Sequence, residues 1–302
     1  MHQILRFATL SLATVLVAVS ASAQRQWTVT GQDVPELAAV DQMMQTVMRS
    51  YDIRGGSVAI AKDGRLVYAR GFSWDQPWVE PIQPTTLFRI GSISKSITSI
   101  AIHQLIEQGL LAHDTLVMPS LGIQPLGGGP TDPRLASVTV DHLLTHTSGM
   151  FSLGNIHTAD DVVAAAHGEQ SPPTRQEFAS YTIAQPFLFE PGTSWDYNNY
   201  GYIMLGMLAE RVSGQDFPEY VFDHIFRPLG VSRARMGHTL RTDLAPTETT
   251  YDGVDGSPYS APVENAFAAG VAVMSAPDLA RIYSALYDHP AASGLLDEQT
   301  VE

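Results

Sequence analysis

The sequence predicts a composite fold, in which an α/β part flanks an all-helical part. Segments with strand patterns are concentrated before residue 90, whereas helical patterns dominate the middle of the chain. Pro- and Gly-rich segments at 122–133 and 245–262 indicate long loops over the surface or around a cleft. We expect residues 24–115 and 271–302 to form the α/β part, residues 116–270 to form the helical part, and the functional site to lie in the cleft between them.

Residues 1–23 have the pattern of a secretory signal peptide. An apolar run at 7–19 follows Arg6, and the small-residue sequence "ASA" precedes Gln24. This run is too short to cross a bilayer, and no later stretch reaches the roughly 18 apolar residues that a transmembrane helix needs. The alternative is a buried N-terminal helix. We expect cleavage after Ala23 and an exported, periplasmic or extracellular protein with no membrane span in the mature chain.

The composition excludes several classes of chemistry. The chain has no cysteine, which excludes disulfides, a thiol nucleophile and thiolate metal sites. Its net charge of −14 becomes −15 when the positive charge of Arg6 leaves with the signal peptide, and such a field repels nucleic acid and anionic membranes. A hydrophobic content of 44% is typical of a globular chain that is held together by its core.

The first predicted elements of the mature chain are a helix and a hairpin. The helix begins at Pro35 and ends at Ser50. Its apolar face carries Leu37, Val40, Met44, Val47 and Met48. The next stretch, "GGSVAIAKDGRLVYARGFS", predicts two strands joined by a turn at Asp63-Gly64. Two strands alone are marginally stable in water, so we expect further strands or a helix layer against this hairpin.

A helix with one buried face follows. Its apolar positions recur at helical spacing, at Ile93, Ile97, Ile100, Ala101 and Leu105. Gly109 is a natural C-terminal stop. Ser92 is therefore expected in the first turn of this helix.

Two helices are predicted in the middle of the chain. Thr139 is expected to cap a short helix. After a turn at 191–192 and a short strand-like segment, a second helix begins at about Tyr200 and stops at Gly214.

Two more helices are predicted towards the C-terminus. Asp216 is expected to cap a helix that has Glu219 three residues further on and closes at Gly230. The last helix begins at Ser275, with Asp278 in its first turn.

The spacing of Ser92 and Lys95 points to nucleophilic catalysis. Side chains three residues apart on a helix share a face, so the Lys95 nitrogen can come within hydrogen-bonding reach of the Ser92 hydroxyl. A serine hydroxyl is a poor nucleophile until its proton is removed, and a buried lysine can accept that proton as a neutral amine. Arginine cannot, because its guanidinium stays protonated. The helix N-terminus adds free N–H groups for a developing oxyanion.

The scarcity of lysine supports this interpretation. The chain has 15 arginines and only two lysines, Lys62 in a predicted turn and Lys95. By itself, S-x-x-K is a weak signal. The alternative is a capping serine followed by a solvent-facing lysine.

Several segments together resemble the serine hydrolases related to class C β-lactamases and penicillin-binding proteins. This family includes D-alanyl-D-alanine carboxypeptidases, D-aminopeptidases and β-lactamase-like esterases. The matching segments are the hairpin, "SISK" at 92–95, "LLTHTSGM" at 143–150, "PGTSWDYNNYGYIMLG" at 191–206, "IFRPLGV" at 225–231 and "AAGVAVMSAPDLARI" at 268–282. They cover nearly all of the mature chain in the family's order.

The resemblance implies a fold and four site residues. The fold is an antiparallel sheet flanked by helices, with a helical subdomain. Ser92 matches the acylated nucleophile and Lys95 its partner. The family's Y-x-N motif matches "YNN", with Tyr197 as a second proton-transfer group and Asn199 as the residue that orients Lys95 and the substrate amide. Whether Lys95 or Tyr197 takes the Ser92 proton stays open, and the alternatives are a packed aromatic at Tyr197 and a helix N-cap at Asn199.

The chain departs from the family pattern near its C-terminus. It has no S-D-N triplet, which favours the class C-like branch over the class A arrangement. Neither K-T-G nor H-x-G occurs after Ala268, although the family carries such a triplet on a strand that shares the oxyanion hole. We therefore expect the chain that stops at Glu302 to be an incomplete copy without its C-terminal sheet strands, to express poorly and to hydrolyse little.

Other functions fit the sequence less well. The stretch "GVSRA" at Gly230 lacks the second glycine of a G-x-S-x-G nucleophile motif. His142 and His146 are four residues apart but lack the glutamate of H-E-x-x-H, which favours polar histidines beside the site over zinc ligands. His103 is expected to be a packing or surface histidine. The main alternative is a non-catalytic, penicillin-recognising fold kept as a binding or scaffold protein.

The expected reaction is acyl transfer. Ser92 attacks an ester, amide or β-lactam carbonyl, an acyl-enzyme forms, and water or another acceptor releases the acyl group. No cofactor and no metal are needed. The expected partner is a small-molecule or peptide acyl substrate, and the family uses esters, D-amino-acid peptides and β-lactams.

Overall fold

A computed structural model of the protein describes most of the chain. The described residues are 26–74, 80–154, 156–169, 172–251, 257–260, 262–287 and 294–301. The predicted signal peptide lies outside them. Within the described ranges, no helix is long and apolar enough to cross a membrane.

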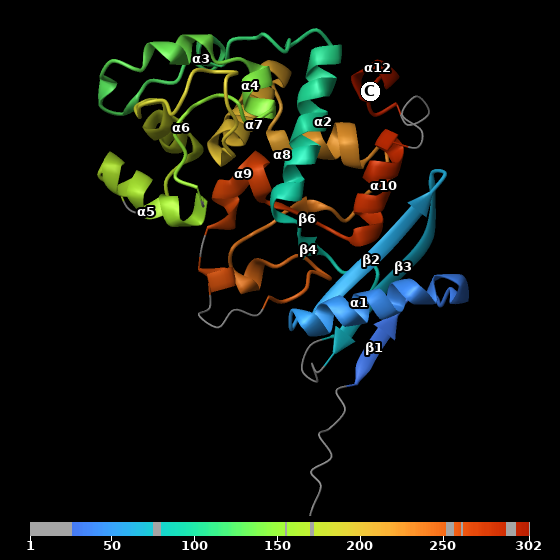
Figure 1. Ribbon diagram of the computed structural model, residues 1–302. Helices are drawn as coiled ribbons and strands as arrows, with labels where there is room; N and C mark the ends of the chain where they lie inside the picture. Colours follow the sequence, from blue (N-terminus) through green and yellow to red (C-terminus); the bar gives the residue numbers. More distant parts are fainter. Residues whose placement is uncertain are drawn as a thin grey trace, which may run out of the picture.

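The larger sheet has three antiparallel strands in the order β1-β3-β2 (Figure 1). They are β1 (Trp27–Thr30), β2 (Gly55–Lys62) and β3 (Arg65–Trp74). Asp63 and Gly64 join β2 to β3, and both have positive φ (52° and 74°), as a two-residue hairpin turn requires. The predicted hairpin is confirmed, and β1 supplies a third strand.

Helices pack against this sheet. A sheet of so few strands is only marginally stable alone, so this packing was expected. α1 (Ala38–Ser50) follows a short 3-10 turn and contacts β2, while α10 (Ala276–Tyr287) contacts both β2 and β3. Met48 of α1 is buried in a small cluster with Phe72 and Trp74. Val47, which we expected on the buried face, is 42% exposed, so the apolar stripe of α1 is narrower than the sequence pattern suggested.

A second, smaller sheet connects distant parts of the chain. Its strands β4 (Phe88–Arg89), β6 (Ala272–Met274) and β5 (Arg235–Met236) pair antiparallel in the order β4-β6-β5. This sheet holds the segment before Ser92 next to the segment before α10.

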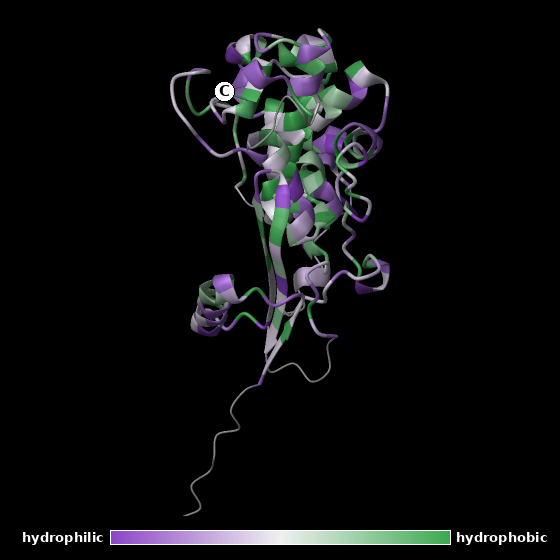
Figure 2. Cartoon of the chain, turned by 90° about the vertical axis from the view of Figure 1, so that its right-hand side faces the viewer, coloured by the Kyte–Doolittle hydropathy of each residue, from purple (hydrophilic) through white to green (hydrophobic). Residues whose placement is uncertain are grey.

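The helix-rich part contains most of the core. Its helices are α2 (Ser94–Glu107), α3 (Val117–Leu121), α4 (Val140–Leu144), α5 (Ile156–His167), α6 (Arg175–Ile183), α7 (Asn199–Ser213), α8 (Phe217–Val221) and α9 (Phe267–Gly270), and α12 (Glu298–Val301) lies near the C-terminus. Figure 2 shows hydrophobic segments gathered through the middle of this part. Buried side chains from α2 to α10 form one continuous apolar cluster, with α2 and α7 in contact.

Two predicted helix caps are confirmed. Thr139 Oγ1 accepts the backbone N–H of His142 at the start of α4. Ser275 Oγ accepts the backbone N–H of Asp278 at 3.3 Å at the start of α10.

The predicted cap of α8 is wrong. Asp216 precedes α8 but makes no side-chain capping bond. The amide of Phe217 donates instead to the carboxylate of Glu210 on α7, at 3.1 Å, and Pro218 has no N–H to offer. A tertiary contact therefore replaces the local one.

The predicted strand-like segment before α7 is not a strand. In residues 193–198 the amides of Asp196 and Asn198 donate to the carbonyl oxygen and to the ring nitrogen Nδ1 of His146. These amides are thus bonded to a loop, and no ladder forms.

Candidate active site

Ser92 lies in a single 3-10 turn, Gly91–Ile93, that leads directly into α2. Gly91 has φ 54°, a left-handed conformation that suits glycine and lets the chain turn from β4 into the helix. Ser92 is exposed, as a nucleophile must be. Its expected place at the helix start is confirmed, although Ile93 is 45% exposed and does not join the buried face.

Lys95 is buried, with 6% of its surface exposed. Its Nζ lies 2.8 Å from Asn199 Oδ1, 2.6 Å from the Ala269 carbonyl oxygen and 3.3 Å from Ser92 Oγ. Burial lowers the pKa of Lys95 to about 8, because the ammonium is desolvated and none of its contacts is a carboxylate. The solvent-facing alternative is therefore wrong.

The three oxygen atoms around Lys95 Nζ determine where a neutral amine would direct its two N–H groups and its lone pair. A neutral amine has two N–H donors and one lone pair. The Asn199 and Ala269 oxygens can only accept, so they take both N–H groups and direct the lone pair towards Ser92 Oγ. The arrangement is thus suited to removing the Ser92 proton.

Tyr197 contacts the same hydroxyl from the other side. Its phenol oxygen lies 2.7 Å from Ser92 Oγ, and the Lys95 ammonium lies 4.8 Å from the centre of its ring. The Tyr197 side chain stays partly open, at 37% exposure. The Tyr197 hydroxyl is therefore aimed at Ser92, although its ring also packs against His146.

Asn199 and Asn198 have different roles. Asn198 is the N-cap of α7, since its Oδ1 accepts the amides of Tyr200 and Gly201. Asn199 is the first helical residue and points to Lys95, while its Nδ2 donates to the Gly154 carbonyl at 3.1 Å. The N-cap alternative for Asn199 is therefore wrong, because the cap is the preceding residue. The sequence has two consecutive asparagines and does not show which of them is the cap.

The Ala269 carbonyl is a site group that sequence reasoning missed. It lies in α9, which is tied to α2 because Thr98 Oγ1 donates to the Ala268 carbonyl at 2.6 Å and the Ala272 amide donates to Ser94 Oγ at 3.1 Å. A backbone oxygen leaves no mark in a side-chain pattern. The small residues of "AAG" were the available signal, because they permit such a close approach.

The two histidines of "HLLTH" make different contacts. His142 Nδ1 accepts the Thr139 amide and completes the capping box of α4. His146 lies against Tyr197, with ring centroids 4.6 Å apart. Among the residues that the structure describes, no group of three or more His, Asp or Glu side chains gathers as a metal site would. His103 Nδ1 bonds the Ser99 carbonyl oxygen within α2, as a packing histidine would.

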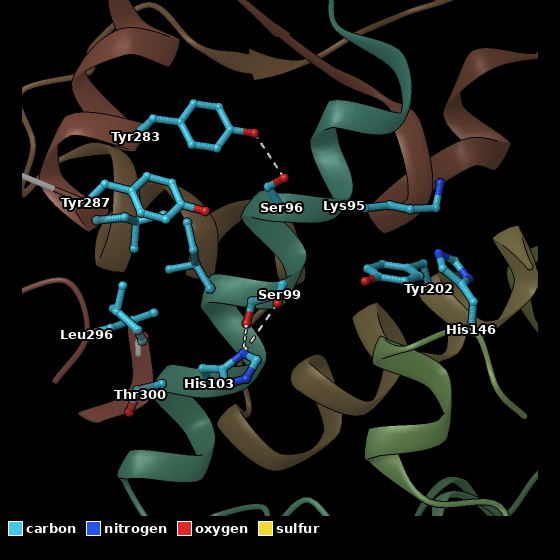
Figure 3. Close-up of a pocket in the computed structure, with 13 residues that line it drawn as sticks. Lys95, Ser96, Ser99, His103, His146, Tyr202, Tyr283, Tyr287, Leu296 and Thr300 are labelled. Carbon is cyan, nitrogen blue, oxygen red and sulfur yellow. Dashed lines mark hydrogen bonds between the residues drawn. The ribbon is translucent and has the colours of Figure 1, made fainter. Parts of the chain in front are cut away.

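A cavity of about 340 Å³ extends across α2 from Lys95 (Figure 3). Lys95, Tyr202 and His146 lie on one side of the helix, and Tyr283 and Tyr287 lie on the other. Burial raises the pKa of Tyr202 to about 12, so its phenol stays protonated beside Lys95. Neither Ser92 nor Tyr197 lines this cavity, so it lies beside the contacts of the Ser92 hydroxyl and does not contain them.

Comparison with known proteins identifies the family of the chain. A family model described as Beta-lactamase matches residues 40–301. The chain is 29% identical to the putative penicillin-binding protein PbpX of Bacillus subtilis, over 77% of this chain and 55% of that protein. It is 30% identical to esterase EstB of Burkholderia gladioli, over 66% of this chain and 51% of that protein. The chain thus spans about half the length of these relatives.

A solved structure shows the same fold. The octameric penicillin-binding protein homologue from Pyrococcus abyssi matches with a TM-score of 0.65 at 27% identity, over 88% of this chain and 59% of that one. The expected class, helices around antiparallel sheet strands with a helical part, is confirmed.

Proposed function

The chain belongs to the beta-lactamase family, and we propose that it is a serine hydrolase that forms an acyl-enzyme on Ser92. One observation carries the proposal. The Ser92 hydroxyl oxygen lies between the Lys95 amine at 3.3 Å and the Tyr197 phenol at 2.7 Å. A nucleophile, a candidate base and a second proton-transfer group are thus in mutual contact. With S-x-x-K and Y-x-N, the class C-like branch is the best match.

In the proposed acylation, Lys95 is the base. Tyr197 donates its O–H to Ser92 Oγ, which leaves the Ser92 proton to point at the lone pair of neutral Lys95. Oγ bonds to the substrate carbonyl carbon as this proton moves to Nζ. With a pKa of about 8, about a tenth of the Lys95 side chains are already neutral at pH 7.

Collapse of the tetrahedral intermediate breaks the bond to the leaving group. Tyr197 faces the same oxygen and is placed to give its proton to that group, and it regains a proton from the Lys95 ammonium. Water then attacks the acyl carbon while the same two residues run the proton transfers in reverse. The backbone N–H of Ser92 is the proposed oxyanion donor, because the next two amides, those of Ile93 and Ser94, already bond to backbone carbonyls of the 3-10 turn.

The substrate class is an ester, amide or β-lactam carbonyl. An esterase and a penicillin-binding protein among the relatives support this range. The predicted signal peptide supports export, so the substrate would be met outside the cytoplasm.

Covalent labelling tests the proposal. The purified protein is treated with a fluorophosphonate and with a fluorescent penicillin, and the modified peptide is identified by mass spectrometry. We expect the label on Ser92, its loss in Ser92→Ala, and full labelling in Ser120→Ala, which removes a hydroxyl that only bonds its own helix. Labelling that persists in Ser92→Ala would refute the proposal, and no labelling by either probe would favour a binding protein.

A further inference from the structure

We propose that His146 is the positioning residue that holds Tyr197 against Ser92, an inference that rests on the proposed function. His146 bonds the residues on both sides of Tyr197. Its carbonyl oxygen accepts the Asp196 amide at 2.9 Å, and its Nδ1 accepts the Asn198 amide at 3.1 Å. His146 therefore fixes the backbone position of the residue before Tyr197 and of the residue after it.

The imidazole ring also supports the phenol directly. Its centroid lies 4.6 Å from that of Tyr197 and 5.1 Å from that of Tyr202. Tyr202 in turn donates to the Leu144 carbonyl at 2.9 Å, which fixes the end of α4 two residues before His146. Figure 3 shows the His146 and Tyr202 rings side by side next to Lys95. The ring is thus packed between the phenol that it would position and an anchored neighbour.

The backbone of His146 is held in an uncommon conformation. Its φ is 60°, in the left-handed region that non-glycine residues rarely adopt. Such a conformation persists where surrounding contacts enforce it. Here the conformation closes α4, because the His146 amide donates to the Leu143 carbonyl at 3.4 Å and the Thr147 amide donates to the His142 carbonyl at 2.9 Å. The end of α4 thus fixes the direction in which His146 presents its carbonyl and ring to the residues around Tyr197.

The hydrogen-bond network requires a neutral imidazole. Nδ1 faces a backbone N–H of Asn198, so it must be the lone-pair nitrogen and Nε2 carries the proton. Burial and the charge of Lys95 lower the pKa of His146 below its ordinary value, and Asp196 opposes this shift. The other groups that face the ring are the phenols of Tyr197 and Tyr202. Protonation of Nδ1 would place its N–H against the Asn198 N–H, and the hydrogen bond between His146 and the Asn198 amide would be lost.

The test compares acylation rates of His146 variants in the purified protein, measured as the stopped-flow burst of p-nitrophenol from a short-chain ester. His146→Gly removes the ring and the acceptor while it tolerates the positive φ, and we expect a loss of roughly 10- to 100-fold in rate. In His146→Asn the amide oxygen can accept from Asn198, and asparagine also tolerates this φ, so we expect partial rescue of the rate. His113→Ala removes a solvent-exposed histidine and should leave the rate unchanged.

A double-mutant cycle separates positioning from general damage. If His146 acts through Tyr197, His146→Gly lowers the rate of the Tyr197→Phe protein by less than about threefold. The inference would be overturned if the rate losses of His146→Gly and Tyr197→Phe multiply in the double variant. It would also be overturned if His146→Gly and His146→Asn are both folded and lose the same rate. If Ser92 takes no label in the wild-type protein, the proposed function itself fails. If Ser92 is labelled but the two rate losses multiply, only the positioning role of His146 is refuted.

A pH profile provides an independent readout. In the wild type, the logarithm of the acylation rate falls with slope one as Lys95 takes up its proton, and it falls more steeply over a further range at lower pH, where protonation of His146 adds a loss of its own. In His146→Asn the slope stays at one. A slope of one in both proteins would contradict the positioning role.

Discussion

At the residue scale, the proposed mechanism depends on Lys95. It is buried without a carboxylate partner, and its nitrogen has two carbonyl-type acceptors and one hydroxyl neighbour. The sequence indicated this chemistry because lysine is so rare in the chain, and the geometry explains why arginine would not serve. A planar guanidinium could bond both acceptors but has no lone pair to offer Ser92.

Lys95→Arg tests this residue-scale claim. We expect the acylation rate to fall by roughly 100- to 10,000-fold, because charge is kept and the base is lost. Stopped-flow release of p-nitrophenol from a short-chain ester measures it. Lys62→Arg is the matched control, since Lys62 is the other lysine of the chain and lies exposed at the end of β2. An active Lys95→Arg protein beside an active control would contradict the claim.

At the scale of elements, α9 must approach α7 closely to present the Ala269 carbonyl. Gly206 of α7 makes this possible, because a Cβ there would lie 2.4 Å from a ring carbon of Phe267 and 2.5 Å from the Ala268 Cβ. α9 is therefore placed by a packing contact that only glycine allows.

Gly206→Ala should destabilise the protein by about 1–3 kcal/mol through overpacking, and it should slow acylation because the Ala269 carbonyl is displaced. Urea unfolding and probe labelling measure the two effects. Gly129→Ala is the control: its φ is −75° and no atom lies within 4 Å of the added carbon, so it should be neutral or slightly stabilising. Equal stability of the two variants would rule out the close-packing argument.

The helix α5 carries a second buried ionisable group. Asp160 is 2% exposed, and its Oδ1 accepts from Asn265 Nδ2 at 3.0 Å, while Oδ2 has no partner among the described residues. Burial raises the pKa of Asp160 to about 6. The folded state therefore binds this proton more tightly than the unfolded state, and the stabilisation is complete below about pH 4 and is lost as the pH rises through 6.

Asp160→Asn should remove this pH dependence, because an amide oxygen can still accept from Asn265 and no charge is buried. Relative to wild type, we expect the variant to gain up to about 3 kcal/mol between pH 4 and pH 7.5. Urea denaturation across this range measures it, with exposed Asp161→Asn as the control. A gain that does not change with pH would show that Asp160 is charged at both ends of the range.

At the scale of the whole molecule, a loop cluster holds the strand that leads to Ser92. Arg89 of β4 donates to the carbonyls of Pro258 and His238 and stacks on Tyr251 at 4.7 Å. Its Nε lies 3.7 Å from Glu248, whose side chain is 1% exposed. This one side chain thus connects β4 to the long loop that the sequence predicted after residue 245.

Arg89→Ala should destabilise the protein by about 3 kcal/mol, because the buried Glu248 carboxylate keeps its hydrogen bonds from Ala245 and Tyr251 but loses its countercharge. Arg89→Ala combined with Glu248→Gln should recover part of this loss. Thermal or urea unfolding of the single and double variants measures the recovery. If the two losses simply add, the Glu248 charge is not the cause.

Elements that are marked by residues close together in the sequence were predictable. Elements that depend on contacts between distant segments were not. The Asp63-Gly64 turn and the caps Thr139 and Ser275 are read directly from the chain. The strands of the small sheet are two or three residues long, and β4 pairs with a strand that lies far away in the sequence, so no local pattern marks them. In the site, Ser92 and Tyr197 were predicted from motifs, whereas the Ala269 carbonyl is placed by tertiary packing, for which the small residues around it are only a weak sequence signal.

The pH dependence of Ser92 acylation under single-turnover conditions tests the central claim most directly. We predict a rate that rises with pH and levels off with a midpoint of about 8, the pKa of Lys95, as the amine loses its proton. A rate that does not change between pH 6 and pH 9 would contradict the account, because the amine would then not be the base.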